Sequence, residues 1–497
     1  MCHLLGNYDE NSSDLWKRLG EGEIVKLFRL FAVSLSLTFL LTGVNLPENT
    51  AEAAKKPDIM FIYIDDMSPK ATRLWSSCRR TPALCKFVKQ GIWLKNAGAS
   101  TPRCCPARVN AYTGRWSHNN GVTENDAGPF RPRQSVAVKL QKRGYYTVHH
   151  GKFLNNFPHY TPTRKSVFKY AKGWNVFDIN WSHHGKFYNY SLWTKSGVEK
   201  HGNKPRDHSS LVAARKVAKH IRNAPKNKPL FAFVALYDGH APYQPMARFE
   251  RHEKCQDIKP WTGPSFNEED VSDKPKYIRD LPIRSISSYN LRTRCEAILT
   301  VDFVTQKIRK ALKQTGRLKN TLLIFTADNG WLMNEHRAVG KLLPYSTPVP
   351  LYMLWPRKWG NTKRIIREPV SNVDLAPTFC AIAGCKMGRA DGINLLPLLN
   401  GRVDRLNRLF IYEENLHPGG NTRPSWYGIR TTHKYSDVLW AYTEYANGEE
   451  ELYNLSEDPH ELENLANRPA FAAKVKELHD MLHQQVIKPD GVKFRSS

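Results

Sequence analysis

The sequence predicts an α/β protein with a large, mostly parallel central sheet flanked by helices, plus a smaller C-terminal antiparallel sheet with a helix. Three continuous apolar runs, over residues 58–64, 229–236 and 321–327, are typical of strands buried on both faces of a parallel sheet. Amphipathic segments of helical period separate these runs, as expected of an α/β fold. From about residue 400 the pattern changes to short strands, and 497 residues are enough for two domains.

The other elements follow from the periodicity of the chain. Helices are predicted over 81–93, 135–143, 207–222 (with Asp207 as its cap) and 287–312. Buried strands are predicted over 145–150 and 349–355, and the aromatic-rich segment 157–205 is expected to form loops. The C-terminal part is expected to contain strands over 409–413, 426–431 and 434–442, and a helix over 470–486. The predicted divisions are a leader with an N-terminal extension (1–53), a large domain (54–398) and a C-terminal subdomain (399–497).

The N-terminal leader resembles a secretory signal peptide. Lys26 and Arg29 precede an apolar run over 30–44, and Ala51 and Ala53 offer a cleavage site between small residues. The expected location is therefore secreted or periplasmic, or lysosomal in a eukaryote, with no transmembrane domain in the mature chain. An uncleaved membrane anchor is the alternative, although the run is short for a membrane span.

The charge of the chain indicates an anionic partner. A formal net charge of +28 creates a field that attracts polyanions. The basic residues are scattered rather than gathered in one arm, and no nucleic-acid-binding motif is present, so nucleic acid is not expected as a partner. A merely solvated basic surface is the alternative interpretation.

Polar side chains follow two of the buried strands. Asp65 and Asp66 come directly after the first strand, and Asp328 and Asn329 follow the run over 321–327. Ligands of open α/β sheets bind at the carboxyl ends of strands, and a set of carboxylate and amide oxygens favours Ca²⁺, with Mg²⁺ also suitable. Alone, an Asp-Asp pair is more often a turn.

The segment around Cys104 carries the most specific motif. Cys104, Pro106 and Arg108 form a C-x-P-x-R pattern, and Thr113-Gly114 follows. This pattern resembles the signature of the type I sulfatases, and the Cys-Cys-Pro form is similar to the N-acetylglucosamine-6-sulfatase branch. Without that resemblance, the pentapeptide would be read as a loop ahead of a helix, with Pro106 in the first turn.

The resemblance implies a covalent chemistry at Cys104. In that family a separate formylglycine-generating enzyme oxidises this cysteine to formylglycine (3-oxoalanine), which hydrates to a geminal diol. One hydroxyl attacks sulfur and the other later expels sulfate. The resemblance also places Arg108 beside the nucleophile, at the start of a helix, and Cys104 among the metal ligands with Asp65, Asp66, Asp328 and Asn329.

Three further motifs stand in the order that the family shows. Gly151-Lys152 follows a strand, His240-Ala241-Pro242 matches His-x-Pro, and Gly340-Lys341 lies downstream. The resemblance implies that Lys152 and Lys341 contact the sulfate and that His240 donates a proton to the leaving oxygen. Asp238 is a candidate for orienting His240. The implied fold is the alkaline-phosphatase-like sandwich.

The motifs together predict an exported sulfuric ester hydrolase that acts on a sulfated sugar or glycosaminoglycan. Its expected partners are the sulfated carbohydrate and the formylglycine-generating enzyme. Two alternatives remain: a phosphonate monoester or phosphodiester hydrolase on the same scaffold, and a non-catalytic binder of sulfated polysaccharide.

The nine cysteines fit an exported protein, in which disulfides can form. Candidate pairs are Cys78 with Cys85, Cys380 with Cys385, and Cys255 with Cys295. These pairs leave Cys104 and Cys105 free, and Cys2 falls within the leader. Connectivity stays open from sequence alone.

Overall fold

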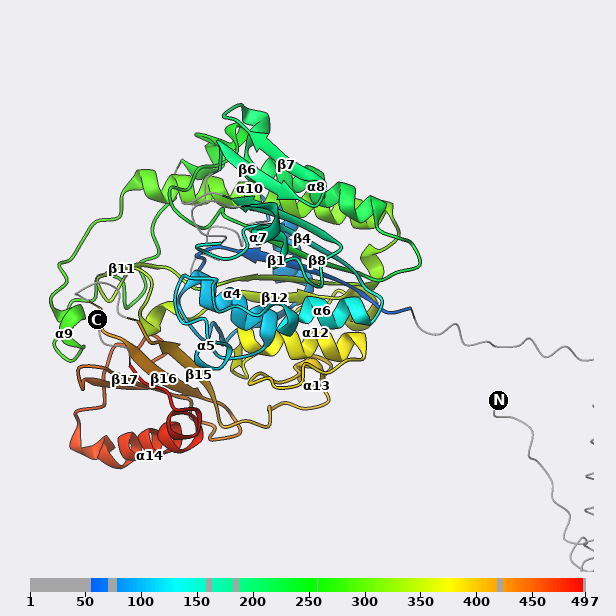
Figure 1. The fold of residues 1–497 in the computed structure, drawn as a ribbon. Helices are drawn as coiled ribbons and strands as arrows, with labels where there is room; N and C mark the ends of the chain where they lie inside the picture. The colour runs from blue at the N-terminus through cyan, green and yellow to red at the C-terminus, as the bar shows by residue number, and fades with distance from the viewer. Residues whose placement is uncertain are drawn as a thin grey trace, which may run out of the picture. The chain divides into compact units, whose positions relative to one another are not determined.

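A ten-stranded sheet runs through the centre of the computed structural model (Figure 1). The structure describes residues 55–69, 78–157, 163–181, 187–256, 258–417 and 423–494, and the predicted leader lies outside them. The order of the strands across the sheet is β13 (Arg364–Ile366), β2 (Ile92–Leu94), β12 (Leu351–Leu354), β9 (Thr321–Ala327), β1 (Asp58–Ile64), β8 (Leu230–Leu236), β4 (Tyr146–Gly151), β5 (Val176–Trp181), β6 (Tyr190–Thr194) and β7 (Gly197–His201).

The centre of the sheet is parallel. Strands β9, β1, β8, β4 and β5 pair in parallel, whereas β12 and β6 run antiparallel to their neighbours. All seven residues of β1, of β8 and of β9 are buried, because helices cover both faces of the sheet. Ile64 lies level with Leu236 and Ala327, so the residues that follow these three strands emerge at the same edge.

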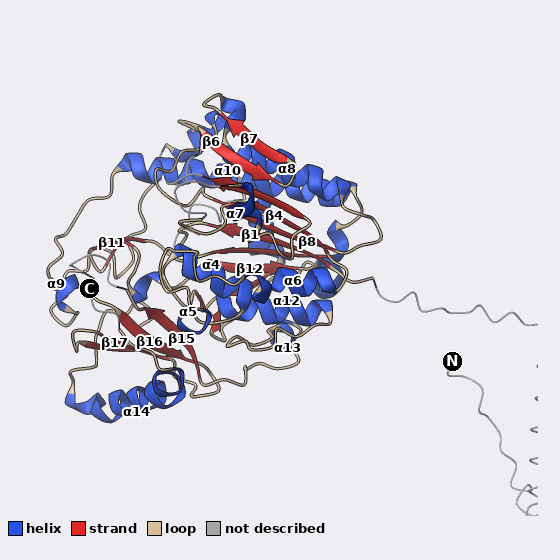
Figure 2. Ribbon diagram, in the orientation of Figure 1, coloured by secondary structure: helices blue, strands red, loops and turns tan. Residues whose placement is uncertain are grey.

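Helices form a layer on each face of the sheet (Figures 1 and 2). The long helices α8 (Ser209–Asn223) and α10 (Ser288–Gln314) pack together on one face, where α3 (Pro82–Gln90) also contacts α10. On the other face, α12 (Leu375–Ala383) contacts both α4 (Cys104–Thr113) and α6 (Val136–Lys142). The predicted α/β class with a mostly parallel sheet is confirmed.

The remaining elements before the C-terminal sheet are short. The helices are α5 (Ser117–Asn120), α7 (Arg164–Phe168), α9 (Lys276–Arg279), α11 (Pro356–Trp359) and α13 (Leu396–Leu399). Two small ribbons pair β3 (Ala97–Gly98) with β14 (Val370–Ser371), and β10 (Leu332–Glu335) with β11 (Ala338–Gly340). Among the described residues, no helix combines the length and the apolar character needed to cross a bilayer.

The C-terminal region builds a second, antiparallel sheet. It consists of β15 (Phe410–Asn415), β16 (Trp426–Thr431), β17 (Trp440–Tyr445) and β18 (Glu450–Asn454), followed by the helices α14 (Ala472–Leu482) and α15 (Lys488–Asp490). Helix α14 packs on β16 and β17 and encloses an apolar cluster that includes Tyr412, Leu452 and Leu478. The predicted antiparallel sheet with a helix is thus present, while the domain boundary at 398/399 stays a prediction.

The sequence-based prediction was wrong in the aromatic-rich segment. Residues 157–205 were expected to form loops, yet their described parts contain β5, β6 and β7, which extend the sheet. Strand β7 alternates half-buried and exposed residues at the sheet edge, so it lacks the continuous apolar run that marks a central strand.

Several element boundaries also differ from the prediction. Helix α3 ends at Gln90, because Gly91 breaks it and residues 92–94 form strand β2. His208, rather than Asp207, caps α8: its imidazole accepts a hydrogen bond from the backbone N–H of Ser210. The third C-terminal strand begins at Trp440 instead of residue 434, and β18 was not predicted as a separate strand.

The structure forms all three candidate disulfides. Cys78 is bonded to Cys85, Cys255 to Cys295, and Cys380 to Cys385. In the part of the chain that the structure describes, Cys104 and Cys105 are the free cysteines, and both are buried.

His118 of α5 joins the region of the large sheet to the C-terminal region. Its Nδ1 lies 2.9 Å from Glu414 Oε2 on β15, and its Nε2 lies 3.1 Å from Asp490 Oδ2 on α15. Burial alone would lower the pKa of His118, but the Glu414 carboxylate outweighs burial and raises it from 6.5 to about 9. The imidazolium therefore stabilises the folded protein.

We expect His118→Gln to destabilise the protein in a pH-dependent way. Because the pKa of His118 is raised on folding, its contribution is fully present below about pH 6.5 and is lost as the pH rises through about 9. Urea unfolding at pH 6 should show a loss of about 2 to 3 kcal/mol, and at pH 10 a much smaller one. Equal destabilisation at both pH values would contradict the assignment.

Candidate active site

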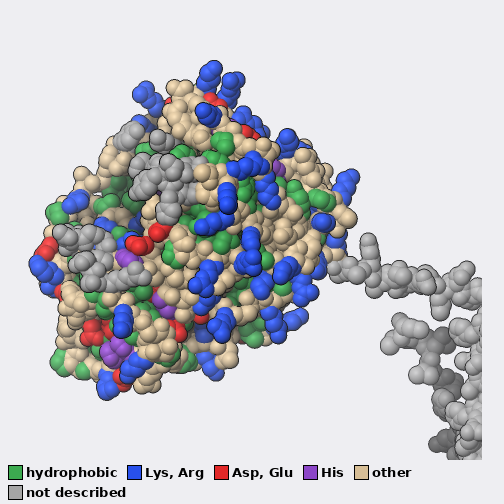
Figure 3. Space-filling model, in the orientation of Figure 1, with side chains coloured by type: hydrophobic (Ala, Val, Ile, Leu, Met, Phe, Trp, Pro, Cys, Tyr) green, Lys and Arg blue, Asp and Glu red, His purple; other side chains and the backbone are tan. Residues whose placement is uncertain are grey.

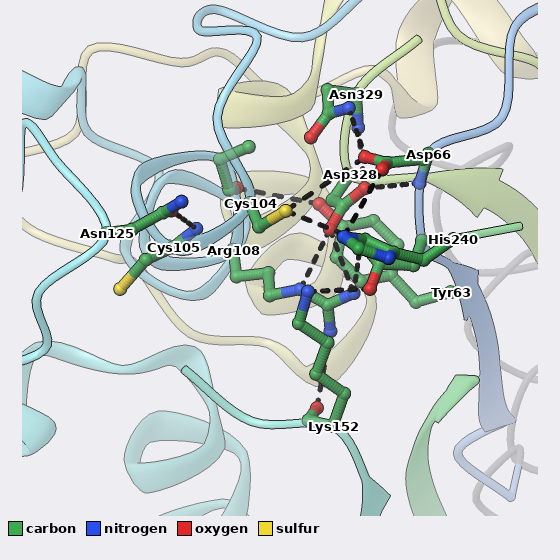
Figure 4. A network of polar contacts seen from close by, with 12 residues as sticks. Tyr63, Asp66, Cys104, Cys105, Arg108, Asn125, Lys152, His240, Asp328 and Asn329 are labelled. Atoms are coloured by element: carbon green, nitrogen blue, oxygen red, sulfur yellow. Dashed lines mark hydrogen bonds and ion pairs between the residues drawn. The ribbon is translucent and has the colours of Figure 1, made fainter. Parts of the chain in front are cut away.

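The polar residues that follow four parallel strands meet at one edge of the sheet. Asp65 and Asp66 follow β1, Lys152 follows β4, His240 lies beyond β8, and Asp328 and Asn329 follow β9. Figure 4 shows the side chains of Asp66, Lys152, His240, Asp328 and Asn329 converging on Cys104 and Arg108 from helix α4. Lys341, just after β11, contacts Asp66 and Cys104 in the same cluster. The structure therefore brings all nine predicted site residues together.

Helix α4 supplies Cys104 and Arg108. The helix begins at Cys104, four residues before the predicted start at Arg108, and ends where Gly114 adopts a left-handed conformation with φ of 69°. Residues four apart lie on the same helix face, so the guanidinium of Arg108 projects on the side of Cys104. Pro106 is tolerated in the first turn because its missing N–H would have no helical partner there.

The thiol of Cys104 lies among charged groups. Its Sγ is 2.8 Å from Lys341 Nζ, 3.4 Å from Asp65 Oδ1 and 4.0 Å from Asp66 Oδ1. Burial, with the nearby Asp65 charge, raises the pKa of this thiol to about 12. The unmodified cysteine thus stays protonated at neutral pH, and a protonated thiol is a weak nucleophile.

Three buried carboxylates pair with three cations. Asp65 Oδ2 lies 2.6 Å from Lys152 Nζ, and burial alone would raise the pKa of Asp65, but Lys152 holds it well below its usual range. Arg108 Nε donates a hydrogen bond to Asp328 Oδ2 at 2.9 Å, and Arg108 Nη2 forms an ion pair with the same oxygen at 2.9 Å. Burial and the Asp65 charge raise the pKa of Asp328 to about 6.

The third pair joins Lys341 to Asp66, whose other oxygen has no hydrogen bond. Asp66 Oδ2 and Asn329 Oδ1 are both buried without a hydrogen-bond partner among the described residues, while Asn329 Nδ2 donates to Asp66 Oδ1 at 2.7 Å. Buried oxygen atoms without hydrogen bonds are costly unless an ion or water satisfies them. One carboxylate oxygen of Asp65, one of Asp66 and the Sγ of Cys104 lie within 4.8 Å of one another. With the oxygens of Asp328 and Asn329, which follow the adjacent strand β9, they offer an oxygen-rich donor set that suits a hard cation.

Gly239 allows the two strand ends to approach closely. A Cβ at this position would lie 1.8 Å from the backbone oxygen of Asp65, so any larger residue would push the β8 loop off the β1 loop.

His240 stands at the rim of the site. Its side chain is 36% exposed, and its Nε2 lies 3.6 Å from Asp66 Oδ2. Nδ1 lies 2.6 Å from the carbonyl oxygen of Ala241, whereas Asp238 accepts a hydrogen bond from Ser210. The prediction that Asp238 orients His240 was therefore wrong, because the local backbone performs that role.

The sequence-based reasoning missed three residues around the charged cluster. The guanidinium of Arg108 lies 5.2 Å from the ring centroid of Tyr63, and Lys152 Nζ lies 5.7 Å from that of Tyr237. The backbone N–H of Cys105 donates to Asn125 Oδ1 at 3.0 Å. Tyr63 and Tyr237 adjoin strand-end motifs, which could have indicated them, but no local pattern points to Asn125.

The arrangement is suited to an anionic ester. Permanent cations and an exposed imidazole can bind the non-bridging oxygens and protonate a leaving oxygen, while the oxygen donors can hold a dication that polarises the ester.

Comparison with protein families supports this chemistry. A family model described as Sulfatase matches residues 57–385, and one described as N-sulphoglucosamine sulphohydrolase, C-terminal, matches residues 335–488. An arylsulfatase of Volvox carteri is 27% identical, over 86% of this chain and 74% of its own length. An N-acetylglucosamine-6-sulfatase of Capra hircus is 25% identical, over 84% of this chain and 81% of its own.

Solved structures share the fold, which is the expected alkaline-phosphatase-like sandwich. A protein solved with its substrate D-glucosamine-2-N,6-O-disulfate has a TM-score of 0.71 at 22% identity, covering 88% of this chain and 98% of that one. The phosphonate monoester hydrolase of Agrobacterium radiobacter has a TM-score of 0.64 at 19% identity, covering 86% of this chain and 95% of that one. Because the Sulfatase model covers well over half of the 497 residues, the chain belongs to the sulfatase family of sulfuric ester hydrolases.

Proposed function

We propose that the chain is an exported sulfatase that uses formylglycine at position 104 and a divalent cation to hydrolyse sulfate esters of a sulfated sugar or glycosaminoglycan. The observation that carries this proposal is the place of Cys104: the first residue of a buried helix, 2.8 Å from Lys341 and 3.4 Å from Asp65. A thiol with no function would not need a surrounding of buried charges.

The cation would be held by Asp65, Asp66, Asp328, Asn329 and the side chain at position 104. Buried Asp66 Oδ2 and Asn329 Oδ1, which lack hydrogen bonds within the described structure, support this assignment. An all-oxygen set without histidine favours Ca²⁺ or Mg²⁺. When bound, the cation would supply Lewis-acid stabilisation of negative charge on the ester oxygens.

The modified side chain at position 104 would require a formylglycine-generating enzyme as maturation partner. As a hydrated aldehyde it would supply two hydroxyls on one carbon, one for attack and one for release of sulfate. The raised pKa of the unmodified Cys104 thiol is consistent with the need for this conversion.

Three permanently charged side chains would bind the negative charge of the ester. Arg108, Lys152 and Lys341 surround Cys104 and each faces a carboxylate, so a cation bound to those carboxylates would leave the three side chains to bind the oxyanion. His240, exposed at the rim, is placed to donate a proton to the leaving oxygen.

The surface and the relatives support a sulfated carbohydrate as substrate. Lysine and arginine side chains are numerous around α6 on the face shown in Figure 3, and the net charge of +28 attracts polyanions. The relatives named N-acetylglucosamine-6-sulfatase act on one such sugar. Export is supported by the predicted leader and by three disulfides, which persist in oxidising compartments.

Cys104→Ala is expected to lower kcat/KM for a sulfate ester by about a thousandfold or more, because it removes the nucleophile. Cys105→Ala is the matched control: this buried thiol lies outside the charged cluster, so activity should stay within about tenfold of wild type. Mass spectrometry of tryptic fragment Cys104–Arg108 from the native host should show an aldehyde in place of the Cys104 thiol. An unmodified thiol in an active enzyme would contradict the formylglycine mechanism.

Removal of the divalent cation is expected to abolish turnover reversibly. A chelator should inactivate the enzyme, and Ca²⁺ or Mg²⁺ should restore it and raise the melting temperature, since a ligand that binds only the folded state stabilises it. In Asp66→Asn the rise in melting temperature on adding cation should be lost. Asp238→Asn alters a buried carboxylate that bonds to Ser210, so it should keep the rise.

The phosphonate monoester hydrolase alternative rests on the shared fold. A sulfate monoester offers three non-bridging oxygens to Arg108, Lys152 and Lys341, whereas a phosphonate monoester or phosphodiester offers two. We therefore expect kcat/KM for nitrophenyl sulfate to exceed that for bis-nitrophenyl phosphate by about tenfold or more. The reverse ratio would favour the alternative, and heparin-column retention without sulfate release would indicate a non-catalytic binder.

A further inference from the structure

The C-terminal sheet carries a second group of metal-ligating side chains, which differs from the catalytic centre in composition. Glu444 lies on β17, His479 lies in α14, and His483 begins the π-helical turn His483–Ile487 that continues α14. Histidines four residues apart on a helix project from the same face. Both imidazoles therefore face the strand that carries Glu444.

The ligand atoms of these three residues are spaced like a metal coordination sphere. Glu444 Oε1 lies 3.0 Å from His479 Nδ1 and 3.1 Å from His483 Nε2, while Oε2 lies 2.9 Å from His483 Nε2. The three atoms all lie within 4.8 Å of one another. In a tetrahedral zinc site with bonds of about 2.0–2.1 Å, neighbouring ligand atoms are about 3.3 Å apart. Only small side-chain movements would admit an ion.

The rings of His479 and His483 also lie against each other. The two rings stack with centroids 4.1 Å apart and planes 23° from parallel.

Solvent reaches this group of three residues, and neighbouring side chains hold its ligands in place. The side chains of His479, His483 and Glu444 are 42%, 21% and 13% exposed, which leaves room for an ion to enter and for a water ligand. Tyr442 donates a hydrogen bond to Glu444 Oε1 at 3.1 Å, and the Tyr427 ring packs edge-on against His483. Such outer contacts fix the orientation of ligating side chains.

We propose that Glu444, His479 and His483 form a binding site for a transition-metal dication of the Zn²⁺ type, which would clamp helix α14 to strand β17. Two imidazoles and one carboxylate select borderline-soft ions. The oxygen ligands offered in the candidate active site by Asp65, Asp66, Asp328 and Asn329 select hard ions instead. This site is independent of the proposed hydrolysis. Figure 3 shows histidine and acidic side chains gathered in the region of α14 and the C-terminal sheet.

The test is a Zn²⁺ titration of the full chain by calorimetry in excess Ca²⁺, together with the melting temperature. His479→Gln and His483→Gln should each weaken one Zn²⁺-binding event by about tenfold or more and reduce the Zn²⁺-dependent rise in melting temperature. His433→Gln is the control: His433 pairs with Glu368 at 2.7 Å but belongs to no three-residue ligand group in the described structure, so binding should be unchanged.

Two further measurements keep the outcome decisive. Glu444→Gln preserves side-chain volume and should lose the same binding event, which tests the site if a histidine variant folds poorly by circular dichroism. Co²⁺ should give the visible absorption of a four-coordinate nitrogen and oxygen site in wild type and not in His479→Gln/His483→Gln. Wild-type Zn²⁺ affinity and stoichiometry in that double variant, or in folded Glu444→Gln, would overturn the proposal.

Discussion

Ion pairs between buried carboxylates and buried cations hold together the candidate active site at the carboxyl ends of β1, β4, β8 and β9. Asp65 and Arg108 have no exposed side-chain surface, and Lys152 is nearly as buried. Removing one partner of such a pair would leave a buried charge without compensation, which is strongly unfavourable. The cluster is therefore a single unit: each carboxylate holds a cation, and the cations in turn surround Cys104.

The parallel sheet makes this compensation possible. Strands β1, β8 and β9 stay in register until their last residues, so the groups that follow them are delivered to one edge. Glycine at position 239 lets the loops after β1 and β8 approach within contact distance. The apolar strands supply no chemistry themselves, but their burial on both faces fixes the positions of the charged groups.

Polar contacts in the C-terminal region connect separate parts of the chain. His118 reaches from α5 to Glu414 and Asp490, and so ties the segment that follows helix α4 to the C-terminal sheet and to α15. Farther out, ion pairs from His479 of α14 and from His483 of the following π-helical turn to Glu444 hold this part of the chain against that sheet. The side chains of Asp490, His479 and His483 are partly exposed, so solvent and salt screen their ion pairs more than those of the deeply buried cluster around Cys104.

The sequence alone determined the fold class and the apolar central strands, because continuous apolar runs are local patterns. Its resemblance to the sulfatase motifs indicated the residues that meet at the candidate active site. It missed β5 to β7 as strands, since these lie toward or at one edge of the sheet and lack the long apolar run of the central strands. Only the tertiary structure decided which cation pairs with which carboxylate, that Asp238 turns to Ser210, and that His479 and His483 meet Glu444. Those contacts join residues far apart in the chain, and no local periodicity records them.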